Sequence, residues 1–141
     1  MKCFATSVLI SAVGALLVGC SNGLPPDLAK QASSDFHARY NREEFDELYA
    51  HAGDLLKRNY SRQQFVDFVA AIHAGLGDVD SSELVQSKIT VSSSGSDVRL
   101  GYRTRFERGS GIEAFVWHIR SGNAQLVGYN IDSPMLARSQ K

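Results

Sequence analysis

The side chains that could do chemistry lie on what we predict to be the inner face of a β-sheet. Tyr102, Thr104, Glu113 and Asn130 occupy inward positions of consecutive strand-like segments, and Asp132 is expected beside Glu113 at the rim. Two neighbouring carboxyl groups can share a proton, and such a pair can act as a general acid or base. Carboxylates at strand ends are also often simply exposed to water, so we assign no catalytic residue from this pair alone.

Alternation of apolar and polar residues predicts the strands that position these side chains. In residues 98–106 every second side chain is mainly apolar or aromatic, which is the pattern of a half-buried strand. Residues 112–120 and 124–131 continue this pattern, and Gly109-Ser110 and Gly122-Asn123 supply the turns between them. We therefore expect three antiparallel strands that follow one another in sequence order.

These turns predict a register that gathers the aromatic side chains on one face. We expect Phe106 opposite Glu113, Tyr102 opposite Trp117, and Trp117 opposite Gly128. A glycine opposite the only tryptophan leaves room for the indole, so Trp117 is the expected centre of the inner face. The residues expected to line a pocket there are Tyr102, Thr104, Glu113, Trp117 and Asn130.

The same register sends a second set of side chains to the outer face of the last two strands. Contiguous exposed apolar patches usually mark interaction sites, so this set is a candidate homodimer interface or a site for another protein. The basic side chains of Arg99, Arg103 and Arg105 flank it. Alternatively, Met135 and Leu136 of the C-terminal tail cover it. The outward set is Ala114, Val116, His118, Val127, Tyr129 and Ile131.

The remaining polar residues do not form a recognisable metal or nucleic-acid site. His37, His51 and His73 fall on separate predicted helices, and His118 points outward, whereas a zinc site needs about three or four convergent ligands. The chain has 15 basic and 15 acidic residues, so it lacks the positive charge that nucleic-acid binding requires. We expect no metal, no cofactor and no nucleic-acid partner.

Three amphipathic helices are predicted before the sheet, beginning near Asp27, Asn41 and Ser61. Asn41 and Ser61 are each followed three residues later by Glu or Gln, as in a capping box, and apolar residues continue the second helix to Leu56. A more polar strand over residues 83–92 is expected at the sheet edge. The prediction is an α+β domain of three helices packed on a curved, four-stranded antiparallel meander.

The N-terminus, residues 1–19, has the features of a signal peptide. An apolar run follows Lys2 and ends in Leu17-Val18-Gly19-Cys20, which resembles the lipobox of bacterial lipoproteins. In that family the cysteine thiol receives a diacylglycerol, the leader is cut before it, and the new amine is usually acylated, for example with palmitate. The resemblance implies that Cys20 is lipidated. A plain membrane anchor or an ordinary secretory signal is the alternative.

The lipid on Cys20 would make the membrane a partner and would place the protein in the cell envelope. Residue 21 is Ser rather than the Asp that retains enterobacterial lipoproteins at the inner membrane, so the resemblance implies the periplasmic face of the outer membrane. The expected organisation is a lipidated tether over residues 20–26, one α+β domain over 27–133, and a loose C-terminal tail over 134–141.

The order of elements resembles that of the small NTF2-like (cystatin-like α+β) domains of bacterial lipoproteins. Within that superfamily, the chain looks like a member of an uncharacterised family. The stretches that carry the resemblance are Gly101-Tyr102-Arg103-Thr104-Arg105-Phe106-Glu107 and Leu126-Val127-Gly128-Tyr129-Asn130-Ile131. Because that superfamily contains isomerases, dehydratases and non-enzymatic modules, the resemblance leaves the activity open.

We expect a lipid-anchored, non-enzymatic module that binds a protein or small ligand in the cell envelope, with a second copy or an envelope protein as candidate partner. The alternative is a small-molecule-binding or isomerase- or dehydratase-like enzyme that uses the concave pocket of the sheet. A deep pocket closed around a buried Glu113 would favour the enzyme, whereas a filled inner face would favour binding at the surface.

Overall fold

The computed structural model describes residues 23–138, so the predicted signal peptide and the predicted lipidation site, Cys20, lie outside the described part of the chain. The fold is α+β, as predicted, with an open four-stranded antiparallel sheet, and four helices rather than three precede the sheet in the described residues. The elements are α1 (Pro25–Asn41), α2 (Phe45–Ala50), α3 (Asp54–Asn59), α4 (Arg62–Leu76), β1 (Val79–Ser92), β2 (Gly95–Phe106), β3 (Gly109–Arg120), β4 (Asn123–Asp132) and α5 (Pro134–Arg138).

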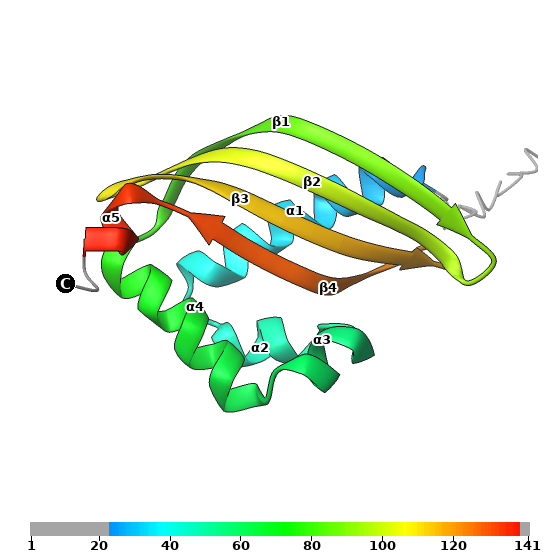
Figure 1. The fold of residues 1–141 in the computed structure, drawn as a ribbon, viewed down its shortest axis with the longest axis horizontal. Helices are drawn as coiled ribbons and strands as arrows, with labels where there is room; N and C mark the ends of the chain where they lie inside the picture. The colour runs from blue at the N-terminus through cyan, green and yellow to red at the C-terminus, as the bar shows by residue number, and fades with distance from the viewer. Residues whose placement is uncertain (1–22, 139–141) are drawn as a thin grey trace, which may run out of the picture.

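The sheet is a meander in which the strands lie in the order β1-β2-β3-β4. Helix α1 runs along one face of the sheet, and α2, α3 and α4 gather on the side of β4 (Figure 1). Strand β1 forms the opposite edge, where the prediction placed the most polar strand (Figure 1). Among the helices of the described chain, none has both the length and the apolar character needed to span a membrane.

The second predicted helix is divided into α2 and α3, and the cause is a contact with the sheet. The backbone N–H of Gly53 donates a hydrogen bond of 2.8 Å to the carbonyl of Leu126, and Ala52 forms a parallel bridge with the same residue. The chain between the two short helices therefore runs beside β4 and satisfies part of its edge, which a continuous helix could not do.

The predicted helix starts at Asn41 and Ser61 have different outcomes. The capping box of Ser61 and Gln64 is present at the start of α4 and is confirmed. Asn41, in contrast, belongs to the end of α1. Its side-chain oxygen accepts a 2.8 Å hydrogen bond from the Val79 N–H, and its side-chain nitrogen donates a 3.0 Å hydrogen bond to the Val79 carbonyl. Asn41 therefore connects α1 to the start of β1.

The turn between β2 and β3 is formed by residues 107–108, not by Gly109-Ser110 as predicted. The Arg108 side chain donates to the last carbonyls of α4, at Gly75, Ala74 and His73, and the Arg108 N–H donates to Leu76. These bonds use carbonyl groups that a helix end leaves without partners.

Because the turn lies two residues earlier, each residue of β2 has a partner four residues away from the predicted one. Tyr102 lies opposite Glu113, and Val98 lies opposite Trp117. The predicted pairs of Phe106 with Glu113 and Tyr102 with Trp117 are therefore wrong. Side chains alternate with a period of two, so this even displacement leaves the predicted inner face of β2 and β3 unchanged.

A β-bulge in β4 reverses the faces of the last part of that strand. Trp117 pairs with Leu126, but Val116 pairs with Gly128, so Val127 is an extra residue. An inserted residue moves every later side chain to the opposite face. The predicted pairing of Trp117 with Gly128 is wrong because the turn is formed by Ser121-Gly122, one residue before the predicted Gly122-Asn123. The bulge makes residues 129–132 face the opposite way from the prediction.

The core lies between the inner face of the sheet and the helices. Trp117 is buried, as predicted, and its ring stacks on Phe115 with centroids 6.1 Å apart and an interplanar angle of 10°. The Trp117 Nε1–H donates a 2.9 Å hydrogen bond to Ser33 Oγ of α1. After the sheet, where a loose tail was expected, residues 134–138 form α5, and Leu136 packs against the core.

Candidate functional site

The central polar feature of the core is the Glu113 cluster, which consists of Glu113, His37, Thr104 and Tyr129. Glu113 is only 1% exposed. One carboxylate oxygen, Oε2, is 2.8 Å from His37 Nε2 and accepts a hydrogen bond from the Thr104 hydroxyl. The other, Oε1, accepts a 2.7 Å hydrogen bond from the Tyr129 hydroxyl. Each oxygen of this buried carboxyl group therefore has a polar partner, as burial of a polar group requires.

Four separate elements build the Glu113 cluster. Glu113 is on β3, Thr104 and Tyr129 come from the neighbouring strands β2 and β4, and His37 comes from α1. The cluster thus joins the helix layer to the middle of the sheet. Aromatic rings surround the imidazole of His37, with the ring centroids of Phe115 and Tyr102 at 5.6 and 6.2 Å.

The environment of the cluster favours neutral tyrosines. Burial first, and then the negative charge of Glu113, hold the pKa of Tyr129 well above its ordinary value of 10.0. Burial also raises the pKa of Tyr102, although a hydrogen bond with Ser33 acts in the opposite direction. Both hydroxyls are therefore protonated at neutral pH and can donate hydrogen bonds.

The predicted inner-face pocket is partly assembled. Tyr102, Thr104, Glu113 and Trp117 are all buried on the inner face, whereas Asn130 is exposed and lies opposite Ala114 on the outer face. Asp132 is also exposed, so the expected carboxylate pair with Glu113 does not form. The β4 bulge causes both differences.

The same bulge breaks up the predicted outer apolar patch. Tyr129 and Ile131 pack on the inner side, where both contact the core, and Val127 is the bulged residue. Val116 and His118 remain on the outer side and are half-buried. His118 Nδ1 lies 2.7 Å from an Asp97 carboxylate oxygen, and His118 Nε2 lies 3.2 Å from the Ser94 carbonyl oxygen. The contiguous surface on which the interface prediction depended is therefore not formed.

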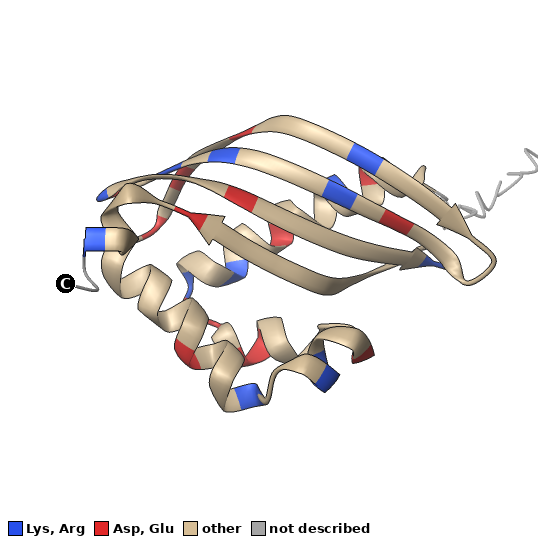
Figure 2. Cartoon of the chain, viewed as in Figure 1, with Lys and Arg blue, Asp and Glu red and all other residues tan. Residues whose placement is uncertain are grey.

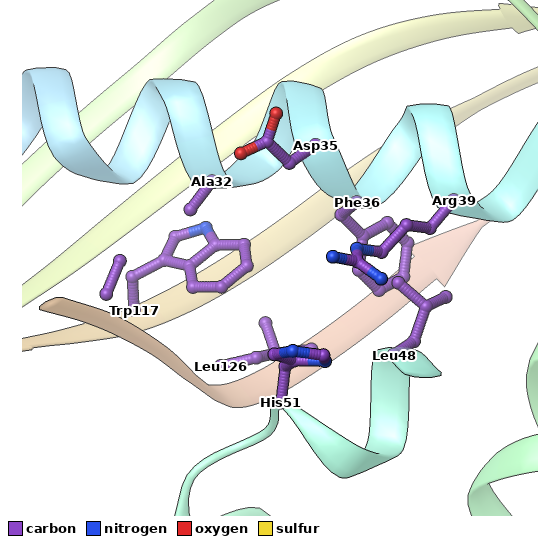
Figure 3. A pocket seen from close by; sticks show the side chains of 9 residues that line it. Ala32, Asp35, Phe36, Arg39, Leu48, His51, Trp117 and Leu126 are labelled. Atoms are coloured by element: carbon purple, nitrogen blue, oxygen red, sulfur yellow. The ribbon is translucent and has the colours of Figure 1, made fainter. Parts of the chain in front are cut away.

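A cavity of about 150 Å³ lies beside the Glu113 cluster, between α1, α2 and the sheet, and we call it the Trp117 pocket. Figure 3 shows the indole of Trp117 on one side, with Asp35 and Arg39 extending from α1 and His51 at the end of α2. Its lining residues are Ala32, Asp35, Phe36, Arg39, Leu48, His51, Trp117, Ala124 and Leu126. The pocket combines an apolar interior with ionisable side chains.

The charged groups of the Trp117 pocket differ in how far they are already paired. Arg39 Nη1 lies 3.9 Å from carboxylate oxygens of both Glu44 and Glu47. His51 Nδ1 is 2.8 Å from the Glu47 carbonyl. Asp35 is exposed, and within residues 23–138 it has no ion-pair partner. The unpaired charge of this pocket is therefore negative.

A second cavity, of about 300 Å³, lies between α3, α4 and β4. Aromatic rings dominate its walls, with the Phe68 and Tyr129 ring centroids 6.2 Å apart. Besides the aromatic residues, two of which are tyrosines, the lining includes the amide residues Gln64 and Asn130. Its lining residues are Leu56, Tyr60, Gln64, Phe65, Phe68, Tyr129 and Asn130.

Two polar neighbours of the predicted site, Ser33 and His37, were not assigned to it from the sequence. Both are buried on α1, four residues apart, as are Phe36 and Tyr40. Residues four apart lie on one helix face, so Ala29, Ser33 and His37 form a second inward row. That spacing was the available signal, but pairing His37 with Glu113, 76 residues away, depends on the three-dimensional fold.

A scan against protein-family models found no matching family, and a search of curated proteins found no match. Among residues 23–138, no group of three or more His, Cys, Asp or Glu side chains is placed to hold a metal ion. Function is therefore inferred from the fold and the geometry of its cavities.

Proposed function

We propose that the protein is a lipid-anchored, non-enzymatic binding module of the cell envelope and that the Trp117 pocket holds a small ligand. The observation that carries the proposal is the contrast between two neighbouring regions. The Glu113 cluster is closed and internally bonded, whereas the Trp117 pocket is hollow and has an unpaired carboxylate at Asp35. The lipobox at residues 17–20 supports anchoring in the envelope, with the periplasmic face of the outer membrane as the favoured location.

The dimensions of the pocket define the class of ligand. An apolar cavity of about 150 Å³ is large enough for one benzene-sized group. The faces of Trp117 and Phe36 favour a flat or branched apolar group. Asp35 favours a cationic head, since opposite charges attract and the other ionisable groups already have partners. A small aromatic or branched amine has both properties.

The enzymatic alternative, an isomerase or dehydratase, would use Glu113 as its acid or base. A general base must come within hydrogen-bond reach of the substrate. Glu113 is 1% exposed, lines neither cavity, and already accepts hydrogen bonds on both oxygens from Thr104 and Tyr129. The inner face is therefore filled around Glu113, which favours the binding module over the enzyme.

The assignment to the NTF2-like superfamily is part of the same proposal. The meander of β1 to β4 and the long α1 that covers its inner face support the assignment. The split of the predicted second helix into α2 and α3 is a departure from the expected three helices.

Trp117 provides a direct test because it is the only tryptophan and it lines the pocket. The fluorescence of the detergent-solubilised protein is titrated with benzylamine and with benzoate, which have the same ring and opposite charges. Benzylamine is expected to change the emission and to bind several-fold more tightly than benzoate, since an exposed ion pair contributes up to about 1 kcal/mol.

Asp35→Asn should abolish the preference for benzylamine, whereas the matched control Asp67→Asn, on α4, should retain it. Absence of saturable binding of either probe at millimolar concentration would contradict the small-ligand proposal. Equal affinities for the two probes in the wild-type protein would contradict the role assigned to Asp35.

A further inference from the structure

The two edge strands of the sheet differ in whether another part of the chain forms hydrogen bonds with their free edge. The edge of β4 is bonded by Gly53 and bridged by Ala52. The edge of β1 lies on the opposite side from α2, α3 and α4 (Figure 1), and residues 80–92 are all exposed. Within the described chain, backbone groups of residues 80–91 bond only to β2. A long edge with unpaired backbone groups is a template for another strand.

The side chains of this edge include an unusual amount of exposed apolar surface. Leu84, Val85, Ile89 and Val91 are 36%, 45%, 43% and 76% exposed. Leu84 and Ile89 are opposite Tyr102 and Val98 of β2, respectively, so both belong to the inner face. A strand added beside β1 would cover part of this surface as well as satisfy the backbone.

We propose that β1 pairs with β1 of a second copy of this chain, antiparallel, around a two-fold axis between Val85 and Gln86. In this register Val79 lies opposite the second copy's Ser92, so the whole of β1 (Val79–Ser92) takes part. The result is one continuous sheet of eight strands. A two-fold axis perpendicular to this sheet keeps α1 of both copies on the same face.

Charge complementarity selects this register. It places Glu83 directly opposite the second copy's Lys88, and symmetry repeats the pair. Both side chains lie on the outer face, because Glu83 pairs with Arg103 and Lys88 pairs with Arg99 of β2. Figure 2 shows charges of both signs along β1. Lys88 has no ion pair within residues 23–138, so it is available to the second copy.

The bulge in β1 makes the face matching possible. Leu84 pairs with Tyr102 and Gln86 with Gly101, so Val85 is an extra residue that reverses the alternation between Glu83 and Lys88. In a regular strand without the bulge, the separation of five residues between Glu83 and Lys88 would put the two charges on opposite faces. With it, the inner residues also match, since Leu84 lies opposite the second copy's Ser87 and diagonal to its Ile89.

The neighbouring registers are less favourable. Moving the axis by half a residue, to Val85 itself, would place inner-face side chains of one copy opposite outer-face side chains of the other over part of the strand. Moving it a full residue, to between Leu84 and Val85, would keep the faces but would place Lys88 opposite Ser81. The proposed register therefore combines opposite charges with matched faces over residues 81–90. At the strand ends a second bulge, between Val79 and Ser81, puts Val79 on the inner face, opposite the outward Ser92.

The test is a charge exchange on the full chain in detergent micelles, with the dimer measured by native mass spectrometry across protein concentration. The wild-type protein should form a dimer. Lys88→Glu and Glu83→Lys should each weaken it about tenfold, because like charges then face one another twice across the ladder. The double variant Glu83→Lys/Lys88→Glu should return to within about twofold of wild type.

Arg120→Glu is the matched control, since Arg120 is exposed at the end of β3, two strands from β1, and lies opposite neither Glu83 nor Lys88. It changes the net charge equally and should leave the dimer within about twofold of wild type. Thermal melts of Lys88→Glu should match wild type. Glu83→Lys should lower stability only slightly, because it loses the exposed Glu83–Arg103 ion pair of 3.4 Å, which contributes up to about 1 kcal/mol. These melts separate loss of pairing from loss of folding. A monomeric wild-type protein, a dimer insensitive to both single reversals, or a double variant that fails to recover would each overturn the proposal.

Discussion

Tyr129 and Glu113 meet in the core, with the tyrosine hydroxyl 2.7 Å from Glu113 Oε1. Tyr129→Phe removes this donor, and among the described residues no other donor reaches that oxygen. A buried acceptor without its partner costs about 1–3 kcal/mol, so the free energy of unfolding should fall by that amount. Denaturant unfolding followed by far-UV circular dichroism measures the change.

The matched control for this substitution is Tyr60→Phe. Tyr60 is 54% exposed, and within residues 23–138 its hydroxyl makes no hydrogen bond. The control should change the free energy of unfolding by less than about 0.5 kcal/mol. A similar small change for Tyr129→Phe would show that the bond to Glu113 does not stabilise the fold.

The tyrosines of the core predict that stability falls at alkaline pH. Burial, followed by the charge of Glu113, raises the pKa of Tyr129 well above 10.0, and burial also raises the pKa of Tyr40. In the unfolded chain both ionise near pH 10, whereas in the folded protein they stay protonated. The stabilisation is therefore complete below pH 10 and is lost as the pH rises above it, by about 1.4 kcal/mol per pH unit for Tyr129.

Unfolding measured at intervals between pH 8 and pH 12 checks this dependence. Tyr129→Phe should reduce the slope above pH 10 by about one proton, since the group that titrates only in the unfolded chain is absent. Tyr60→Phe again serves as the control. A free energy of unfolding that stays level through pH 11 would contradict the assignment.

Much of the sheet could be predicted from sequence because alternation reports which side of a strand is buried. The inner positions of β2 and β3, including Thr104, Glu113 and Trp117, follow from that period of two. The turn was misplaced because Gly109 is a stronger local turn signal than residues 107–108. The bonds from Arg108 to the end of α4 determine the actual turn, and they link segments more than 30 residues apart.

The β4 bulge could have been recognised only from a change of phase in the alternation. Leu126 is buried at an even position, whereas Tyr129 and Ile131 pack inward at odd positions. The sequence also permits a regular strand with Tyr129 outside, and local propensities do not distinguish the two. The hydroxyl bond to Glu113 and the aromatic contacts with Phe36 and Phe115 favour the bulged form.

Trp117 should be one of the largest single contributors to stability. It is 6% exposed, stacks on Phe115 and donates a hydrogen bond to Ser33. Trp117→Ala should lower the free energy of unfolding by about 3–5 kcal/mol, through lost burial and an enlarged cavity. Circular dichroism measures unfolding without the tryptophan signal. Phe68→Ala, at a 41% exposed aromatic position, is the comparison, and an equal effect would place Trp117 outside the core.

Lipidation of Cys20 is the prediction that decides where the protein works. If the predicted leader is cut before Cys20, Cys3 leaves with it and Cys20 is the only cysteine of the expected mature chain. Mass spectrometry of the N-terminal peptide should then show a diacylglycerol thioether. Two or three acyl chains, each worth about 0.8 kcal/mol per buried CH₂, should hold the protein in the membrane fraction through a high-salt wash.

Cys20→Ala should abolish the modification and release the protein from the membrane, or leave it unprocessed. Ser21→Asp is a separate change that retains the lipid. By the resemblance to enterobacterial lipoproteins, it should move the protein from the outer to the inner membrane in a cell with both. An unmodified Cys20 in the wild-type protein, or a Cys20→Ala variant that is processed and localised normally, would exclude the lipoprotein assignment.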